Sequence, residues 1–340
     1  MEIIGGGLMK IRINRSDVGK RVSVRALTEA GTPGEKFTDT VGVLTSWDDD
    51  VLLITRRDGS IVRIVDSFLV AGKIVPAAPA RRRGPAATFE ELARATARGW
   101  QPVESESLGD WELRYADGFT RRANSVLALG DPGVPLDEAL GLVREWYARR
   151  GLHADVQTST GAEGTHELLC AELERRGWAQ HTPAQVWTGA LAPLGDADAD
   201  VSGVRLARTC DEAWLSRYQR FGEGSPAVLK VLHGGPSVWF ASVASQEGAG
   251  SGHGVPAAIG RCVVDGRWAG FMAVEVSPEY RRRGLATAVM TAMARQALEE
   301  GASAAWLQVE SGNEAAKAMY ERMGFAPHHH YHYHRAPEPA

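Results

Sequence analysis

A repeated order of elements constrains the fold of this chain more than any other feature. The first copy runs through REWYARRGLHADVQTST and HELLCAELERRGWAQHTPAQVW, and the second runs through ARQALEEGASAAWLQVES and NEAAKAMYERMGFAPHHHYHYH. In each copy a helix ends at a glycine (Gly151, Gly301), a buried strand follows, and a second helix ends at a glycine before an aromatic residue (Gly177, Gly324). Glycine accepts the left-handed conformation that commonly ends helices. The pattern predicts two copies of one α/β lobe in tandem.

The residues before the repeat have an all-β pattern. VSVR, TVGVLT, VLLITRR and IVRIV are short, β-branched runs separated by turn residues, and Asp58-Gly59 between two of them is typical of a tight hairpin. We expect a small Src-homology-like barrel, which could bind a peptide or serve only as a spacer. The predicted organisation is a barrel at 1–78, a Pro- and Ala-rich linker at 79–87, a first lobe at 88–200 and a second lobe at 201–340.

Charge and hydropathy exclude several kinds of partner. The 340 residues carry a formal net charge of -4, so no global basic field exists to attract nucleic acid or an anionic membrane. No apolar run approaches the roughly 18 residues that a membrane span needs, and MEIIGGGLMKIRINR does not have the pattern of a signal peptide. Three widely spaced cysteines match neither a disulfide framework nor a zinc site. A cytoplasmic protein is predicted.

An arginine-rich turn in the second lobe has the features of an anion site. The strand GFMAVEV is stopped by Pro278, and a long amphipathic helix begins near Gly284. Free backbone N–H groups and the positive end of the helix dipole attract anions at such a turn, and arginine adds bidentate phosphate recognition. A pyrophosphate would suit this turn. Its residues are Arg281, Arg282, Arg283, Gly284, Leu285, Ala286 and Thr287.

SPEYRRRGLA, followed by LQVESGNEAAKAMYERMGF, resembles the GNAT superfamily of N-acetyltransferases across the whole second lobe. The resemblance implies acetyl-coenzyme A as co-substrate, with its pyrophosphate at Arg281 to Ala286. It also implies that the backbone of Val274 and Val276 pairs with the pantetheine arm, that Asn313 contacts the same arm, and that Tyr320 lies near the sulfur. A tyrosine pKa of about 10 exceeds the thiol value of about 8.5, so Tyr320 can protonate the departing thiolate.

The general base is less well defined by the sequence. Related protein N-terminal acetyltransferases carry a glutamate where this chain has Gln308. Glu275 on the other central strand is the nearest candidate, acting directly or through water, although strand alternation could point it away from the site. Glu310 is a weaker candidate, and a water relay without a dedicated base stays open.

The first lobe departs from the motif at both decisive positions. GDPGVP (130–135) stands where the second lobe has RRRGLA, and Asp131 in it would repel phosphate. Leu173 stands where the second lobe has Tyr320. We therefore expect a degenerate first lobe, similar to the inactive half of tandem acetyltransferases. The whole fold is predicted to be multidomain, a small all-β barrel followed by two GNAT-like α/β (α+β) lobes.

Alternate histidines in HHHYHYH (328–334) share one face of a strand and could bind a metal, but the resemblance places them on a terminal strand, so no metal is predicted. The predicted reaction is acetyl transfer to a primary amine of a small molecule, such as an amino acid or amino metabolite, by direct attack in a ternary complex. The alternatives are acetylation of a protein lysine or N-terminus, with the barrel presenting the peptide, and a non-catalytic acetyl-coenzyme A sensor or scaffold.

Overall fold

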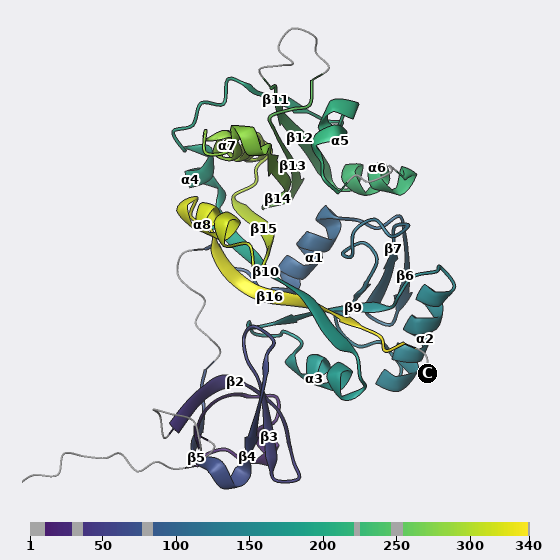
Figure 1. Cartoon of the computed structure of the whole chain (residues 1–340), viewed down its shortest axis with the longest axis vertical. Coiled ribbons are helices and arrows are strands. Elements are labelled where there is room, and N and C mark those ends of the chain that lie inside the picture. Colours follow the sequence, from purple (N-terminus) through teal and green to yellow (C-terminus); the bar gives the residue numbers. More distant parts are fainter. Residues whose placement is uncertain (1–10, 29–36, 77–83, 221–224, 246–253, 339–340) are drawn as a thin grey trace, which may run out of the picture.

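A computed structural model of the chain describes residues 11–28, 37–76, 84–220, 225–245 and 254–338. Most of the predicted linker therefore lies outside the described residues, as does most of the glycine-rich stretch after β12. Figure 1 shows the arrangement, with an N-terminal sheet at one end and the two lobes stacked beyond it.

The N-terminal unit is a five-stranded antiparallel sheet in the order β4-β3-β2-β1-β5. Alternation along β1 puts Val22 and Val24 into its core, together with Leu44, Leu52 and Ile54. Gly59 adopts φ +83° in the turn between β3 and β4, as the Asp-Gly pair predicts. Its strands are β1 (Arg21–Leu27), β2 (Phe37–Asp48), β3 (Val51–Thr55), β4 (Ile61–Val65) and β5 (Leu69–Ile74), with 3-10 turns η1 (Arg15–Asp17) and η2 (Asp66–Phe68).

The predicted closed barrel is not confirmed. Among the described residues β4 pairs only with β3, and β5 pairs with β1 and with an isolated bridge at Ile11, so no ladder joins the two edges. A barrel requires that pairing to remove its edges. Here η2 lies between β4 and β5, and the sheet stays open.

The two lobes share one mixed sheet of eleven strands in the order β11-β12-β13-β14-β15-β10-β16-β9-β8-β7-β6. The elements of the first half are α1 (Phe89–Gly99), β6 (Glu104–Leu108), β7 (Trp111–Tyr115), β8 (Val126–Leu127), α2 (Leu136–Ala148), β9 (Asp155–Thr160), α3 (Glu167–Arg175), β10 (Ala179–Ala190) and α4 (Leu191–Gly195). Those of the second half are β11 (Val204–Ala207), α5 (Glu212–Arg217), α6 (Pro226–His233), β12 (Ser237–Val243), β13 (Ala258–Asp265), β14 (Trp268–Val276), η4 (Pro278–Tyr280), α7 (Leu285–Glu299), β15 (Ala304–Glu310), α8 (Glu314–Arg322) and β16 (Ala326–Arg335).

The lobes exchange their last strands. β10 belongs to the first half of the sequence but pairs antiparallel with β15 and β16 of the second, while β16 pairs with β9 of the first. In Figure 1 these two long strands run side by side through the middle of the molecule. Each lobe is thus completed by a strand from the other.

Helix α1 binds both lobes through two faces. Thr88 caps its N-terminus by accepting a hydrogen bond from the N–H of Glu91 at 3.1 Å. Leu92 and Ala95 pack into the core beneath α5, α6 and β13, whereas Phe89 packs with residues of the first lobe around β8. The opposite face of the second-lobe sheet is covered by α4 and α7.

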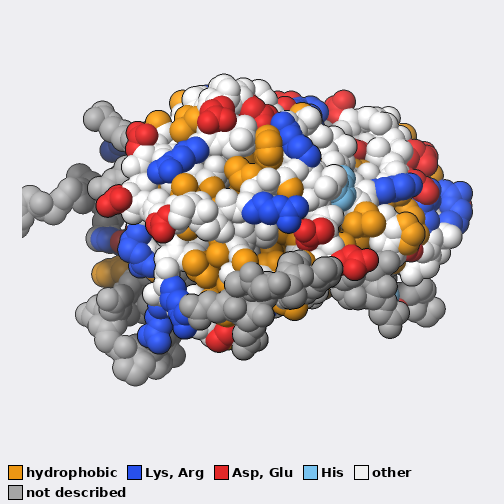
Figure 2. All heavy atoms as spheres, turned by 90° about the horizontal axis from the view of Figure 1, so that it is seen from above, with side chains coloured by type: hydrophobic (Ala, Val, Ile, Leu, Met, Phe, Trp, Pro, Cys, Tyr) orange, Lys and Arg blue, Asp and Glu red, His pale blue; other side chains and the backbone are white. Residues whose placement is uncertain are grey.

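The N-terminal sheet contacts the lobes through its β3–β4 turn. Arg57 donates from Nη2 to the carbonyl of His328 at 3.1 Å, and its own carbonyl accepts from Thr160 Oγ1 at 2.8 Å. None of the described helices is long and apolar enough to cross a membrane. Figure 2, which looks at the second-lobe end, shows Lys and Arg side chains interspersed with Asp and Glu rather than one large basic field.

Candidate active site

Two neighbouring strands separate at the centre of the second lobe. β14 and β15 pair in parallel from Trp268–Ala304 to Phe271–Leu307, and no pairing between them continues beyond that point. At the same place β14 contains a bulge, because Arg261 pairs with Met272 while Ile259 pairs with Glu275, and Ala273 has φ +50°. The bulge turns β14 away from β15 and leaves ladder groups of both strands without that partner. Val274 and Val276 lie on this separated segment.

The turn before α7 has the conformation of an anion-binding nest. Gly284 is the N-cap at φ +79° and makes no side-chain cap, and Arg282 also adopts a left-handed conformation at φ +61°. The first N–H groups of a helix have no intrahelical partner. Successive amides around left-handed residues form a concavity that binds anions. A Cβ at Gly284 would meet nothing within 4 Å, so the backbone is open to a ligand.

The three arginines of the turn have different positions. Arg281 and Arg282 line the main cavity of the protein, whereas Arg283 does not. The Arg283 guanidinium lies 5.1 Å from the ring centroid of Tyr280. Arg281 makes a long contact from Nε to the carbonyl of Val276, at 3.5 Å. All three side chains are exposed.

One cavity of about 1530 Å³ brings together the turn, the separated strands and the candidate catalytic side chains. Every site residue predicted from the sequence lines it except Arg283. The lining residues among those predicted are Val274, Glu275, Val276, Arg281, Arg282, Gly284, Leu285, Ala286, Thr287, Asn313 and Tyr320.

Tyr320 lies on α8, half-buried against the core of the second lobe. Its ring packs edge-on against Phe325, with 6.1 Å between centroids. Burial raises the pKa of Tyr320 to about 12, so the phenol keeps its proton at any physiological pH. Asn313 is the N-cap of the same helix, where its Oδ1 accepts from the N–H of Ala316 at 3.1 Å.

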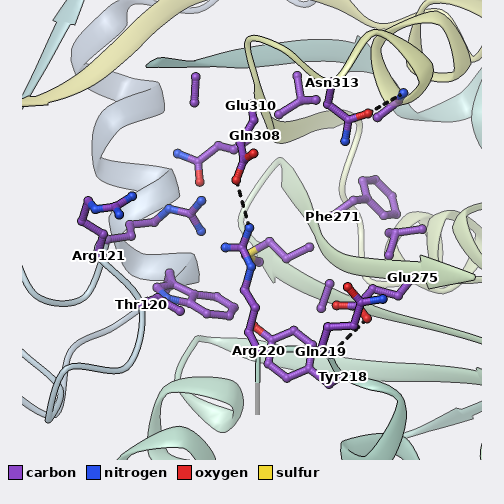
Figure 3. Close-up of a pocket in the computed structure, with 18 of the residues that line it drawn as sticks. Thr120, Arg121, Tyr218, Gln219, Arg220, Phe271, Glu275, Gln308, Glu310 and Asn313 are labelled. Atoms are coloured by element: carbon purple, nitrogen blue, oxygen red, sulfur yellow. Dashed lines mark hydrogen bonds and ion pairs between the residues drawn. The ribbon is translucent and has the colours of Figure 1, made fainter. Parts of the chain in front are cut away.

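Glu275 faces the cavity because of the bulge at Ala273, which breaks the simple alternation of β14. The carboxylate is half-buried and accepts a hydrogen bond from the N–H of Gln219 at 3.1 Å. Burial raises its pKa, and this outweighs the lowering effect of the Gln219 N–H. Figure 3 shows this contact on the right-hand side of the site.

The two other groups considered as bases are placed differently. Gln308 lines the cavity, and its buried Oε1 has no hydrogen-bond partner among the described residues. Glu310 is exposed and forms an ion pair with Arg220, with Nη2 and Oε1 3.3 Å apart. Figure 3 shows Arg220 extending across the site toward Glu310.

The first lobe forms a wall of the cavity, which the sequence did not indicate. Residues 117–122 and Asn124, between β7 and β8, line the end of the cavity that is remote from the α7 turn, together with the ring-bearing residues Tyr331 and Tyr333 of β16. Tyr218 is buried nearby, and burial raises its pKa to about 12. These residues lie up to about two hundred positions apart in the chain, so no local motif marks them.

The corresponding place in the first lobe is small and acidic. A hollow of about 400 Å³ beside the start of α2 is lined by Asp131 and its neighbours. Leu173 is fully buried in the first-lobe core and offers no polar group. That the first lobe does not bind the co-substrate stays a prediction.

The histidine-rich segment forms β16. His329, His332 and His334 are buried, and His332 Nε2 and Thr160 Oγ1 are 3.0 Å apart. Burial lowers the pKa of His332 to about 3, so it is neutral in the folded protein. Within the described ranges no group of three or more His, Cys, Asp or Glu side chains is placed to hold a metal ion.

Comparisons with known proteins agree with this geometry. A family model described as "Probable histone acetyltransferase Rv0428c C-terminal" matches residues 86–334. The "Uncharacterized N-acetyltransferase YobR" of Bacillus subtilis (strain 168) is 24% identical over 251 residues, which are 72% of this chain and 97% of that protein.

Two solved structures share the fold. A GCN5-related N-acetyltransferase from Kribbella flavida aligns with a TM-score of 0.54 and 19% identity, over 75% of this chain and 98% of that one. A tandem GNAT protein from the clavulanic acid biosynthesis pathway aligns with a TM-score of 0.53 and 13% identity, over 75% of this chain and 91% of that one. The resemblance found in the sequence is confirmed: the chain belongs to the family of the Rv0428c C-terminal acetyltransferase model and is an N-acetyltransferase of the GNAT superfamily.

Proposed function

We propose that this enzyme transfers the acetyl group of acetyl-coenzyme A to the primary amine of a small molecule, by direct attack in a ternary complex. The observation that carries the proposal is the single cavity into which the α7 turn, the separated strands, Glu275 and Tyr320 all open. A donor bound at the turn and an acceptor bound near Glu275 would meet in that cavity without a covalent enzyme intermediate.

The residues present fit coenzyme A. Two left-handed residues and the open amides of α7 suit a pyrophosphate, and Arg281 and Arg282 supply matching charge. The separated segment of β14 offers backbone groups at Val274 and Val276 to the amides of a pantetheine arm. Asn313 and Tyr320 line the same cavity from α8.

Glu275 and Tyr320 carry out the proton transfers of the proposed reaction. Glu275 takes a proton from the acceptor ammonium, directly or through water, because only a neutral amine can attack the thioester carbonyl. Free N–H groups at the separated strands stabilise the oxyanion while the new C–N bond forms. Tyr320 then donates its phenolic proton to the sulfur as the C–S bond breaks, and the proton that the acylated nitrogen loses restores the phenol.

The acceptor end of the cavity favours a small molecule over a protein segment. It is bounded by the 117–124 segment of the first lobe, by residues 218–220 and by β16. Walls from three separate segments enclose a compact acceptor on several sides. A protein lysine or N-terminus is the competing acceptor, and the test below includes it.

Release of free thiol from acetyl-coenzyme A over a panel of amino acids, polyamines, amino sugars and peptides tests the proposal. We expect turnover with at least one class of small amine, at a kcat/KM above that for any lysine or N-terminal peptide. A higher kcat/KM for peptides would show that the acceptor is a protein and not a small molecule. Binding of coenzyme A without turnover of any amine would leave a sensor or scaffold.

A further inference from the structure

Around the acceptor end of the cavity, Arg114 and Arg261 are buried and Arg122 is half-buried, and none of the three has a carboxylate partner among the described residues. Arg261 is fully buried and donates only to the carbonyls of Leu232, Gly99 and Gly234 and to the Met272 sulfur. Burial lowers its pKa to about 9. Burying a guanidinium without a counter-charge is costly, so this part of the protein carries a positive field that its own side chains do not neutralise.

Arg114 adds to the same field. It is 1% exposed and donates to the Ser125 carbonyl and hydroxyl and to Gln157 Oε1, which are all neutral acceptors. Neither Arg114 nor Arg261 reaches the cavity itself. Arg114 lies on β7 of the first lobe and Arg261 on β13 of the second, and both contribute charge through a medium of low dielectric.

Arg122 presents this charge to the cavity. Its Nη2 donates weakly to the Tyr331 hydroxyl at 3.3 Å, and its buried Nε has no hydrogen-bond partner among the described residues. The guanidinium lies 5.6 Å from the Trp100 ring, and that of Arg261 lies 5.1 Å from the same ring. The indole is fixed by donation from Nε1 to Thr120 Oγ1 at 2.8 Å. An arginine held by rings, with an N–H left unpaired, is preorganised for an anion.

Arg121 stands beside it. This side chain is exposed at the cavity, and its guanidinium lies 5.6 Å from the Tyr333 ring. Figure 3 shows Arg121 on the left of the site and Glu275 on the right, with Arg220 between them.

The carboxylates of the cavity have other contacts. The Asp155 carboxylate accepts hydrogen bonds from Nε and Nη2 of Arg335, each at 3.0 Å, and Glu310 forms an ion pair with Arg220. Glu275 accepts from Gln219, and Asp117 accepts from the Tyr115 hydroxyl at 3.3 Å. Within the described part of the chain, none of these carboxylates forms an ion pair with Arg121 or Arg122.

We propose that the acceptor amine carries a carboxylate, which Arg122 and Arg121 bind while the amine faces Glu275. This inference rests on the proposed function and narrows its substrate to amino acids or similarly zwitterionic amines. A planar carboxylate matches the guanidinium fork that Arg122 presents at the cavity. The rings of Trp100 and Tyr331 would limit the space around it.

Matched acceptors test the assignment with the wild-type enzyme. The pairs are L-alanine and L-alaninamide, β-alanine and β-alaninamide, and 5-aminovalerate and its amide, each at a pH adjusted to the pKa of its own amine. We expect kcat/KM to be about 10- to 100-fold higher for the acid of at least one pair, the effect of one charge-assisted hydrogen bond. Equal values for acid and amide in every pair would overturn the inference, and faster turnover of O-phosphoethanolamine than of every acid would replace the carboxylate by a phosphate.

Substitutions locate the anion site. Arg122→Gln and Arg121→Gln should raise KM for the preferred acid about 10- to 100-fold, with little change in KM for its amide or for acetyl-coenzyme A. Arg144→Gln, at an exposed arginine on α2, is the matched control and should behave as wild type. Arg122→Lys keeps the charge without the fork and should lose part of the preference. If Arg122→Gln fails to bind coenzyme A, Arg122→Lys takes its place as the test of the anion site. A full preference for the acid in both Arg122→Lys and Arg121→Gln would contradict the inference.

Failure of the proposed function would be visible separately. If coenzyme A binds but no amine is acetylated, calorimetry of β-alanine and 5-aminovalerate against their amides, on protein saturated with coenzyme A, still measures the anion site. Binding of an acid but not its amide, lost in Arg122→Gln, supports the carboxylate site without the reaction. Absence of any difference overturns it.

Discussion

Phe271 and Leu307 are the last paired residues of β14 and β15. Both are buried in the core that α7 covers, so the point at which the strands separate is fixed by packing. Beyond it each strand pairs only with its other neighbour, and residues of both strands line the cavity. The proposed donor site is therefore a gap between two strands of one sheet, next to the bulge at Ala273.

Replacing Tyr320 by Phe should lower kcat while leaving affinity for coenzyme A nearly unchanged. The phenyl ring keeps the packing against Phe325, but the proton donor is lost, which typically costs about 10²- to 10⁴-fold. Steady-state kinetics and calorimetry of the variant measure the two quantities. An unchanged kcat would remove Tyr320 from the acid role.

Replacing Glu275 by Gln should remove the contribution of this carboxylate to the acidic limb of the kcat/KM profile. A base must be deprotonated, so wild-type activity falls as pH decreases through the pKa of Glu275, which burial places above its ordinary value. Because the acceptor's own ionisation affects both enzymes equally, the ratio of wild type to variant at each pH isolates Glu275. A pH-independent ratio would assign proton removal to a water relay.

On the alkaline side of the pH profile, wild-type activity should not decline between pH 8 and 10 through loss of the Tyr320 proton. Its pKa is raised to about 12, well above that interval. The same profile, measured at saturating acetyl-coenzyme A, shows whether a basic limb is present. If one appears and persists in Tyr320→Phe, it belongs to another group.

The arginines of the α7 turn should differ in their contribution to binding. Arg281→Ala and Arg282→Asn should each weaken coenzyme A binding about 10- to 100-fold, as expected for charge-assisted hydrogen bonds. Asparagine at position 282 tolerates the left-handed backbone, so that variant removes charge and keeps the turn. Arg283→Ala should have a smaller effect because its side chain lies over Tyr280 and not in the cavity. Calorimetry with coenzyme A compares the three, and equal losses would contradict this assignment.

The buried histidines should make the protein sensitive to acid. The pKa of His332 is lowered to about 3 in the fold, so the unfolded chain binds a proton there that the folded chain excludes. Its stabilising contribution is present above pH 6.5 and is lost as pH falls toward 3. Urea unfolding at pH 7.5 and 5 should show a smaller pH-dependent loss in His332→Gln, by up to about 2 kcal/mol. Equal losses in both proteins would contradict this.

The isolated second lobe, residues 201–340, should not fold as a monomer. Without β10 it would expose the edges of both β15 and β16, and unpaired edges promote aggregation. Co-expression with residues 84–200 should restore a soluble complex that binds coenzyme A. Size-exclusion chromatography distinguishes these outcomes, and a monodisperse lobe with full coenzyme A affinity would disprove the dependence.

The start of α7 at Gly284 and the position of Tyr320 on α8 agree with the sequence, because both are set by spacing within one turn or one helix. The roles assigned to the turn and to Tyr320 stay predictions. The orientation of Glu275 could not be obtained by counting alternation, since the bulge at Ala273 shifts the count within the strand. The Arg122 wall could not be found either. Its place at the cavity depends on β16, about two hundred residues later, and hydrophobic periodicity carries no information on such pairings.

The order of the sheet was beyond reach for the same reason. Gly151 and Gly301 mark two similar units, but nothing in either copy shows that β10 pairs with β15. The open N-terminal sheet is a milder case. Short β-branched runs predict strands well, whereas closure depends on whether two edges meet, which the pattern does not specify.

The reciprocal placement of β10 and β16 also makes each lobe depend on the other for complete folding. During synthesis on the ribosome neither half can complete its sheet until Arg335 has emerged, so the first lobe must wait, incomplete, for the end of the chain. The first lobe, predicted to be degenerate, carries neither the arginine turn nor the tyrosine of the second lobe. Deleting the first lobe would also remove β10, the strand that pairs with β15 and β16 of the second lobe.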